Sequence, residues 1–347
     1  APIRSSAERT TCEGSAMPVS NGGVAEESIE SIVVIFPGAL GDFLLALPAL
    51  RALRARHADA RATFVVQPSL AALVGLAGVA DTVASIDGAE TAGLFSGDRT
   101  PSWLADRPRV YSWLGADDAE MRTRLARLAR GARFFRTERG GGSVHAAVAY
   151  ARALRVPMAR PALVAGARLV PPISPAADGL LAAATGPVLA LHPGAGARTK
   201  RWDVAGFVQV AHWWRSGGGT VVPIAGPAET GEPPALGVPD VREWALPDVA
   251  AVLSRAALYL GHDSGVSHLA GAVGASGVVI YGPTDPRRWC PLGRNLVPIR
   301  ARGGGPDGIP LTALPAARVI AACRRRFALT RRDPDTSVPA YHPSSRP

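Results

Sequence analysis

The chain has 347 residues, which is enough for two domains of ordinary size, each with its own core. No wholly apolar stretch reaches the roughly 18 to 20 residues of a membrane-spanning helix, so we expect a soluble protein. The net charge of +10 suits an acidic partner. No recognition motif or dense basic cluster with aromatic residues indicates nucleic acid, whereas an anionic membrane surface or a phosphorylated ligand fits the charge.

The cysteines and the lysine give two further hints. Cys12, Cys290 and Cys323 are odd in number and widely spaced, and none belongs to a C-x-x-C pair. This pattern argues against a zinc or redox centre and predicts a cytosolic, metal-free protein. Lys200 is the only lysine among the 38 basic residues.

The two ends of the chain do not look like parts of a fold. Residues 1–29 are small, polar and acidic and lack the basic start and apolar core of a signal peptide, so we expect a disordered leader. Residues 328–347 are rich in Arg, Pro and Ser and predict a disordered tail. The D-x-D sequence at 333–335 lies in this tail, so we do not assign it a metal.

The first ordered segment is a strand, a glycine-containing loop and a helix. Ile32–Phe36 is apolar and β-branched, and Phe43–Arg56 has a helical pattern. In the loop, Gly38 and Gly41 let the backbone approach a ligand. Asp42 either caps the helix or presents a carboxylate at the carboxyl edge of the strand, and capping alone is the simpler interpretation.

Further strands at Arg61–Val66 and Thr82–Ile86, with a helix at Leu70–Leu76, give a βαβαβ order and predict a parallel sheet. The signal is weak over residues 88–144, except for a helix predicted at Asp118–Ala132. Another helix is predicted at Val144–Leu154. Crowded prolines indicate a linker at residues 157–186, which leaves residues 30–156 as the first domain.

A second domain, residues 187–327, repeats the strand–loop–helix pattern. The expected strands are Val188–Leu191, Thr220–Ile224, Ala256–Leu260 and Gly277–Tyr281, and the expected helices are Val204–Trp214, Val249–Ser254 and Leu314–Phe327. The loop after its first strand is rich in glycine and contains Gly194 and Lys200.

A polar elbow follows the strand at Ala256–Leu260. Gly261 can turn the chain sharply, and Asp263 or Ser264 can cap a helix that begins near Gly265, with His268 in its first turns. The amides and dipole of such a helix start favour an anion, typically a phosphate. An ordinary capped unit with a packed histidine explains the segment equally well.

Four segments, in this order and spacing, resemble glycosyltransferase family 9, the ADP-heptose:lipopolysaccharide heptosyltransferases. They are Phe36–Asp42 with Leu47–Arg51, His192–Ala195 with Lys200–Trp202, Asp263–Gly265 with Ser267–Ala270, and Tyr281–Asp285. The resemblance covers residues 32–290. It implies an α/β protein of the GT-B fold, in which two Rossmann-like domains face each other across a cleft. The first domain would mainly hold the acceptor and the second the nucleotide sugar.

The resemblance also implies roles for individual residues. Asp42 resembles the catalytic base, Lys200 the cation that holds the donor diphosphate, and Asp263 the carboxylate that contacts donor sugar hydroxyls. The remaining donor-binding candidates are Ser264, Gly265, His268, Gly194 and Thr284, and the acceptor-side loop contains Gly38 and Gly41. A leaving nucleoside diphosphate gains negative charge in the transition state, so a helix start and an ammonium can stabilise it without a metal. We therefore expect no metal cofactor.

The implied function is metal-independent transfer of heptose or a related sugar from a nucleoside-diphosphate sugar, expected to be ADP-linked. The acceptor would be the lipopolysaccharide core or another surface glycan or glycolipid. The enzyme would be bacterial and cytoplasmic, with peripheral contact at the anionic inner face of the cytoplasmic membrane. Pro37-Gly38-Ala39 stands where heptosyltransferases usually carry an arginine and serines, which leaves the sugar and the acceptor open.

Two other classes of protein are alternatives to a glycosyltransferase. A nucleotide-sugar-binding protein without transferase activity would keep the motifs of the second half and lose Asp42, which is present. A Rossmann dehydrogenase would need G-x-G-x-x-G after a strand. The sequence Gly194-Ala195-Gly196 lacks the third glycine in register.

Overall fold

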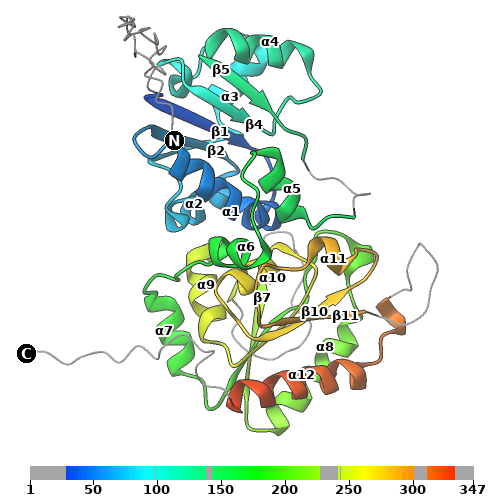
Figure 1. Cartoon of the computed structure of the whole chain (residues 1–347). Helices are drawn as coiled ribbons and strands as arrows, with labels where there is room; N and C mark the ends of the chain where they lie inside the picture. The colour runs from blue at the N-terminus through cyan, green and yellow to red at the C-terminus, as the bar shows by residue number, and fades with distance from the viewer. Residues whose placement is uncertain are drawn as a thin grey trace, which may run out of the picture.

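The computed structural model describes residues 29–97, 99–137, 143–226, 241–242, 244–300 and 311–332. Within these ranges the chain forms two parallel β-sheets, each flanked by helices, in two domains stacked one above the other (Figure 1). This is the α/β architecture that the sequence predicts.

The first domain is built on a sheet with the strand order β3-β2-β1-β4-β5. Its strands are β1 (Ser31–Phe36), β2 (Arg61–Val66), β3 (Thr82–Ser85), β4 (Arg109–Ser112) and β5 (Gly131–Phe134). Its helices are α1 (Leu40–Arg56), α2 (Ala71–Ala77), α3 (Ala89–Ser96), α4 (Ala119–Leu128) and α5 (Ala146–Ala153), with 3₁₀ turns η1 (Pro68–Leu70) and η2 (Ser102–Leu104). Side chains of β1 alternate between two buried clusters, so both faces of the sheet are covered.

The second domain has the strand order β11-β10-β9-β6-β7-β8. Its strands are β6 (Val188–His192), β7 (Thr220–Ala225), β8 (Val241–Arg242), β9 (Leu258–His262), β10 (Gly277–Tyr281) and β11 (Leu296–Arg300). Its helices are α8 (Val204–Ser216), α9 (Leu246–Arg255), α10 (Gly265–Ala272), α11 (Pro286–Trp289) and α12 (Ala316–Arg332), with 3₁₀ turns η3 (Arg198–Lys200) and η4 (Leu311–Ala313). Every residue of β6, β9 and β10 is buried, as expected for central parallel strands.

The region with a weak sequence signal contains more structure than expected. It holds α3, β4, α4 and β5, and the predicted helix at Asp118–Ala132 is wrong at its end, because α4 stops at Leu128. Residues Gly131–Phe134 instead pair in parallel with β4 as an edge strand. The four-residue strand is too short to show an alternating pattern of its own, so the helical periodicity before it masked it.

Three other expectations are modified. The expected linker contains α6 (Arg160–Ala167) and α7 (Pro175–Ala182). Helix α12 continues to Arg332, into the segment expected to be disordered. Gly261 lies inside β9 and not at a turn. A Cβ there would lie 2.1 Å from the Tyr259 hydroxyl, so close packing explains the glycine. Residues 1–28 and the D-x-D sequence lie outside the described residues.

Helix α1 joins the two domains. It packs against α5 and α6 and against α10 of the second domain, and one buried apolar cluster runs through both domains. The Arg51 guanidinium donates to the carbonyls of Gly166 (2.9 Å) and Arg168 (2.7 Å), which fixes α6 on α1. The amide of Leu169 then donates to the Ala272 carbonyl at the end of α10. Helix α1 is thereby linked to the end of α10 through α6 and the residues that follow it.

In the described part of the chain, no helix combines the length and apolar character required to cross a bilayer.

Candidate functional site

The predicted site residues follow strands at the two points where strand order reverses. In the first sheet the reversal lies between β1 and β4, and in the second between β9 and β6. Ligands of open parallel sheets bind outside the carboxyl ends of strands at such points. Asp42 follows β1, Lys200 follows β6 and Asp263 follows β9. The topology thus brings to one place residues that lie far apart in sequence.

Asp42 is the third residue of α1, and its carboxylate has two local partners. It accepts a hydrogen bond from the backbone amide of Ala39, the N-cap residue, and one from the Tyr150 hydroxyl at 3.1 Å. A third-position carboxylate that reaches back to the N-cap amide is half of a capping box. Capping and presentation of a carboxylate, which the sequence offered as alternatives, are therefore both present.

The pKa of Asp42 is raised above its usual value because the carboxyl group is buried. The Tyr150 hydrogen bond, the Ala39 amide and the positive charge of Lys200 each oppose that rise. The influence of Lys200 and Asp263 on Asp42 shows that charges from the second domain act on this carboxylate. A carboxyl group with a raised pKa is better suited to general-base work near neutral pH.

Tyr150 lies on α5, and the sequence gave no signal for it. Its ring packs near Phe36 and Trp113, with ring centroids 5.9 and 6.2 Å away. The start of α5 is tied to the second domain, because the His145 ring bonds the Cys290 carbonyl at 2.9 Å. Tyr150 therefore reaches Asp42 from a helix that both domains hold in place.

The donor-side residues form a compact group around Asp263. One carboxylate oxygen, Oδ2, accepts from Lys200 Nζ at 2.7 Å and from the Thr284 hydroxyl at 2.7 Å. The Asp263 side chain is 6% exposed and that of Lys200 is 29% exposed. The three residues come from the loops after β9, β6 and β10, which are neighbours in the sheet.

His262 fixes the loop that carries Lys200, a role that sequence reasoning missed. Its Nδ1 bonds the Gly194 carbonyl at 3.2 Å, and its Nε2 accepts from the Trp202 amide at 2.7 Å. Burial lowers the His262 pKa to about 4, so the ring is neutral at physiological pH and both bonds are compatible with one tautomer. Both ends of the loop are held, with Lys200 between them. The sequence signal that could have identified His262 is a polar residue at the end of an apolar strand.

The elbow after β9 decides between the two helix caps that the sequence allowed. Ser264 is the N-cap of α10, and its hydroxyl accepts from the Ser267 amide at 3.4 Å. Asp263 does not cap the helix and is free to pair with Lys200 and Thr284. The start of α10 thus lies beside the ammonium, as an anion site requires.

His268 packs on α1 and is not a cation in this structure. Burial lowers its pKa to about 4, and its Nδ1 is buried without a hydrogen-bond partner among the described residues. A Cβ at Gly41 would lie 2.9 Å from the His268 ring, and one at Gly265 would lie 2.8 Å from Leu40. A Cβ at Gly38 would meet the Phe36 ring at 2.5 Å. These glycines allow close packing, and all have ordinary negative φ.

We expect Gly41→Ala to destabilise the protein by about 1–3 kcal/mol, because the added methyl overpacks the α1–α10 contact. Helix propensity alone predicts the opposite sign, a gain of roughly 0.5–1 kcal/mol. Gly75→Ala is the matched control, because Gly75 lies in α2 with open space around its Cβ position. Urea unfolding of both variants measures the two effects. Equal gains in both would contradict the close contact between the domains.

Among the residues that the structure describes, no group of three or more His, Cys, Asp and Glu side chains is placed to hold a metal ion. The described groups of the site are Asp42, Lys200, Asp263, Thr284 and the start of α10.

Residues 170–306 match the model of a family described as glycosyltransferase family 9 (heptosyltransferase). No protein of curated function is matched by sequence. Solved structures are similar over most of the chain. A glycosyl transferase family 9 protein from Veillonella parvula superposes with a TM-score of 0.70, at 18% identity, over 88% of this chain and 99% of that one.

Two further structures come from Escherichia coli. ADP-heptose lps heptosyltransferase II superposes with a TM-score of 0.64, at 17% identity, over 87% of this chain and 99% of that one. The iron-containing heptosyltransferase TibC, in complex with ADP-D-beta-D-heptose, superposes with a TM-score of 0.57, at 16% identity, over 87% of this chain and 77% of that one. At these identities the likeness shows a shared fold, which is GT-B with two Rossmann-like domains.

The family match and the fold agree: residues 170–306 match glycosyltransferase family 9, and both domains share the fold of solved glycosyltransferases of that family.

Proposed function

We propose that this enzyme transfers heptose or a related sugar from an ADP-linked donor to a hydroxyl group of the lipopolysaccharide core or another surface glycan. The observation that carries the proposal is the pairing of two unlike groups at the domain junction. Asp42, from the first domain, has a raised pKa and lies within electrostatic range of Lys200 and Asp263 from the second. A base on one side and a diphosphate site on the other are the two parts that transfer requires.

In the proposed reaction, Asp42 takes the proton of the acceptor hydroxyl as the oxygen attacks the anomeric carbon of the donor sugar. The bond from that carbon to the diphosphate oxygen breaks, and the nucleoside diphosphate leaves with its electron pair. Tyr150 holds the Asp42 carboxylate through its 3.1 Å hydrogen bond. General-base assistance of this kind typically contributes 10²- to 10⁴-fold to the rate.

On the donor side, the charge that develops on the leaving diphosphate is met by the Lys200 ammonium and the start of α10. Both are positioned before the reaction, Lys200 by the His262 contacts and the helix by its Ser264 cap. Preorganised groups aimed at developing charge stabilise the transition state more than the ground state. Asp263, fixed by Thr284, presents a carboxylate that can accept hydrogen bonds from donor sugar hydroxyls.

The proposed adenine nucleotide is supported by two relatives, whose names include ADP-heptose. Thermal unfolding with ADP, UDP, GDP and CDP tests it directly. A nucleotide at 100 times its dissociation constant adds roughly 2.7 kcal/mol to the free energy of unfolding. We expect ADP to raise the melting temperature most. A larger shift with another base would reassign the donor.

We also propose that transfer needs no divalent metal, since Lys200 and the start of α10 supply the positive charge that a metal would provide. TibC, described as iron-containing, makes the question worth testing in this fold. Turnover with the best donor should persist in excess EDTA. Loss of turnover that magnesium or iron restores would contradict the proposal.

The raised pKa of Asp42 predicts a pH dependence. A general base must be ionised, so kcat/KM should fall as the pH drops through the Asp42 pKa, above the usual 3.8 of aspartate. Tyr150→Phe removes a hydrogen bond that lowers this pKa, so the acid limb of the profile should move to higher pH. Tyr111→Phe removes another tyrosine hydroxyl, which bonds His57, and should leave the limb in place. An unchanged limb in Tyr150→Phe would show that Asp42 is not the titrating group.

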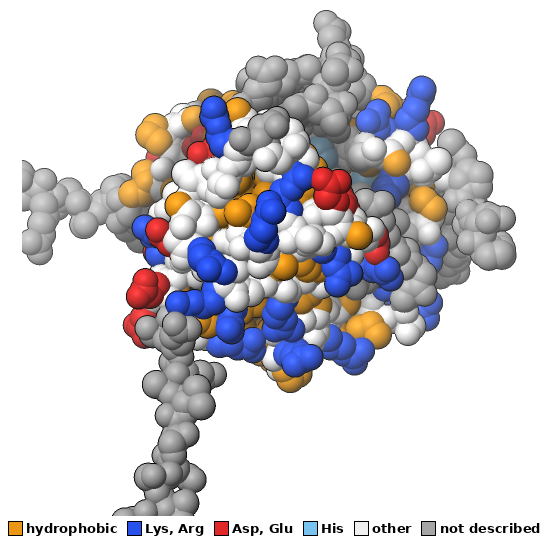
Figure 2. Space-filling model, turned by 90° about the horizontal axis from the view of Figure 1, so that it is seen from above, with side chains coloured by type: hydrophobic (Ala, Val, Ile, Leu, Met, Phe, Trp, Pro, Cys, Tyr) orange, Lys and Arg blue, Asp and Glu red, His pale blue; other side chains and the backbone are white. Residues whose placement is uncertain are grey.

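Finally, we propose peripheral contact with an anionic membrane surface. Figure 2 shows the outer face of the first domain, where basic side chains gather among hydrophobic ones. Helix α4 contributes exposed Arg122 and Arg127 to the surface of this domain. Each basic residue near an anionic surface is worth about 1 kcal/mol. We expect cosedimentation with phosphatidylglycerol vesicles that high salt reverses, and none with phosphatidylcholine vesicles. Equal binding to both would contradict an electrostatic contact.

A further inference from the structure

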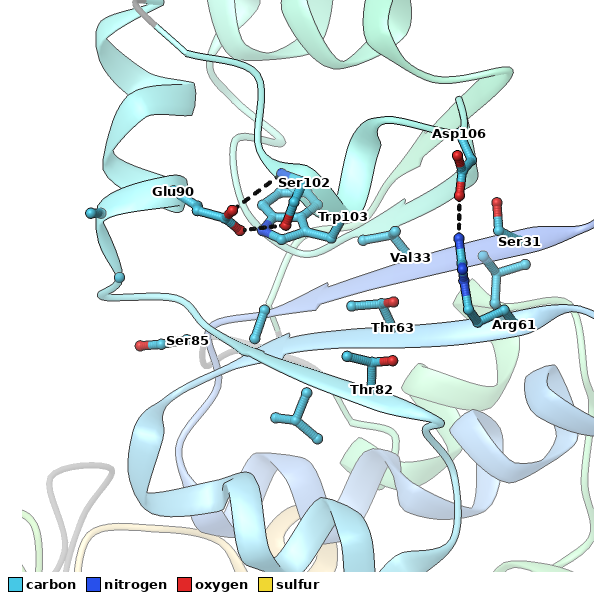
Figure 3. Close-up of a pocket in the computed structure, with 15 residues that line it drawn as sticks. Ser31, Val33, Arg61, Thr63, Thr82, Ser85, Glu90, Ser102, Trp103 and Asp106 are labelled. Carbon is cyan, nitrogen blue, oxygen red and sulfur yellow. Dashed lines mark hydrogen bonds and ion pairs between the residues drawn. The ribbon is translucent and has the colours of Figure 1, made fainter.

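A second cavity, of about 630 Å³, lies in the first domain away from the domain junction. Its floor is formed by β1, β2 and β3, and its opposite wall by α3 and η2 (Figure 3). This is the face of the sheet that α1 leaves uncovered, since α1 packs on the other face. A volume between 300 and 1,000 Å³ is typical of small-molecule sites.

The floor of this cavity is polar where a covered parallel sheet is expected to be apolar. Thr63 of β2 pairs in register with Thr82 of β3, so two hydroxyl-bearing side chains stand side by side. Arg61 pairs in register with Ser31 at the adjoining end of the floor. Farther along the same face, Val65 belongs to the buried apolar cluster. The polar positions are therefore confined to the cavity.

The wall above the floor contains an aromatic ring. Trp103, on η2, faces the floor beside Val33 (Figure 3). Its indole N–H is buried, so a ligand in the cavity can reach the ring and not the N–H. Glu90 of α3 accepts hydrogen bonds from the Ser102 amide (3.4 Å) and hydroxyl (3.0 Å), which holds η2 against α3. The cavity thus offers a flat apolar surface on a fixed wall.

The charges of the lining restrict the ligand. Arg61 is the only cation among the described residues of the lining, and it is already paired with Asp106. Glu90 adds a second carboxylate, so one positive charge faces two negative charges. A phosphate or carboxylate ligand would be repelled, and a wholly apolar ligand would leave the threonine hydroxyls unpaired. The chemistry that remains is an uncharged molecule with many hydroxyl groups and one apolar face.

We propose that this cavity binds a saccharide unit, separately from the site at the domain junction. The sugar hydroxyls would bond Thr63 and Thr82, and the sugar ring would lie against the Trp103 indole. Ser31 begins β1, whereas the loop to Asp42 leaves its other end. The cavity and Asp42 therefore lie at different places on the first domain, and occupancy of the cavity requires no turnover.

Saturation-transfer NMR with the full chain tests this proposal, using methyl glucoside, methyl mannoside, methyl galactoside and N-acetylglucosamine as probes. Trp103→Phe keeps an aromatic ring but reduces the surface that faces the floor, and Thr63→Val removes the hydroxyl at nearly constant shape. Each should weaken binding of the best probe by roughly two- to tenfold, the effect of one neutral hydrogen bond or of part of an aromatic contact. Trp113→Phe is the matched control, because it makes the same change in the other buried cluster of the first domain.

Lys200→Ala separates this cavity from the domain junction. Binding that survives Lys200→Ala and Trp113→Phe but weakens in Trp103→Phe and Thr63→Val supports the proposal. Binding lost in Lys200→Ala and unchanged in the two cavity variants places the sugar at the junction and overturns it. No saturation transfer to any of the four probes also overturns it. None of these outcomes depends on transferase activity, so a failure here leaves the proposed function intact.

Discussion

Asp42→Asn should lower kcat by 10²- to 10⁴-fold, the typical contribution of a general base. The amide is nearly the same shape as the carboxylate and can still accept from the Ala39 amide and the Tyr150 hydroxyl. It cannot accept a proton from the acceptor. Steady-state transfer with a saturating donor measures the effect, and donor affinity, measured separately, should be nearly unchanged.

The stability of Asp42→Asn distinguishes catalysis from a structural role. Burial raises the Asp42 pKa in the folded state, so the ionised carboxylate destabilises the folded protein as the pH rises above 3.8, and fully so above the raised pKa. The amide does not carry this penalty. We expect the variant to be at least as stable as the wild type at neutral pH. If it keeps more than about a tenth of wild-type kcat, another group is the base.

Lys200→Arg should lose roughly tenfold to a hundredfold in kcat/KM despite keeping the charge. The ammonium is compact, and the structure places it 2.7 Å from Asp263 Oδ2, in a loop fixed at both ends. A guanidinium is larger and planar and cannot take the same position. A charge-assisted contact that is lost or misplaced costs about 1.5–3 kcal/mol.

Lys200→Ala should be impaired more, because Asp263 then keeps only Thr284 as a partner in a position that is 6% exposed. The matched control is Arg198→Ala, which removes an exposed positive charge from the same loop. We expect the control to stay within about threefold of wild type. If Lys200→Arg did so as well, only the charge at that position would matter, and the argument from the single lysine would fail.

The elements recognised from sequence are those with strong local patterns. Central strands such as β1 and β6 are continuous apolar runs, and their turns into helices are marked by glycine and a polar cap. Strands β4, β5, β8 and β11 were missed. Three of them, β5, β8 and β11, lie at a sheet margin, where one neighbour is absent and the apolar signal weakens. Strand β4 lies inside its sheet but has only four residues. Strand β11 alternates buried and exposed residues irregularly.

The residues of the candidate site also fall into two groups, those that the sequence indicated and those that it did not. Asp42, Lys200, Asp263, Ser264 and Thr284 were proposed from sequence, because each follows an apolar strand in a short motif of distinctive composition. Tyr150 and His262 were not assigned roles. A tyrosine in the middle of a helix looks like a core residue, and only the packing of α5 against α1 turns its hydroxyl toward Asp42.

The sequence by itself determined the α/β class, the positions of the strand-to-helix loops and the resemblance to glycosyltransferase family 9, because periodicity and glycine-rich motifs are local properties of the chain. The tertiary structure alone decided which loops meet. In each sheet the strand order reverses beside the strand that precedes one of the two carboxylates, β1 for Asp42 and β9 for Asp263. The glycine contacts between α1 and α10 then bring the two residues together. It also decided that Asp263 pairs with Lys200 while Ser264 caps the helix, since both residues could serve as caps and only the approach of the β6 loop distinguishes them.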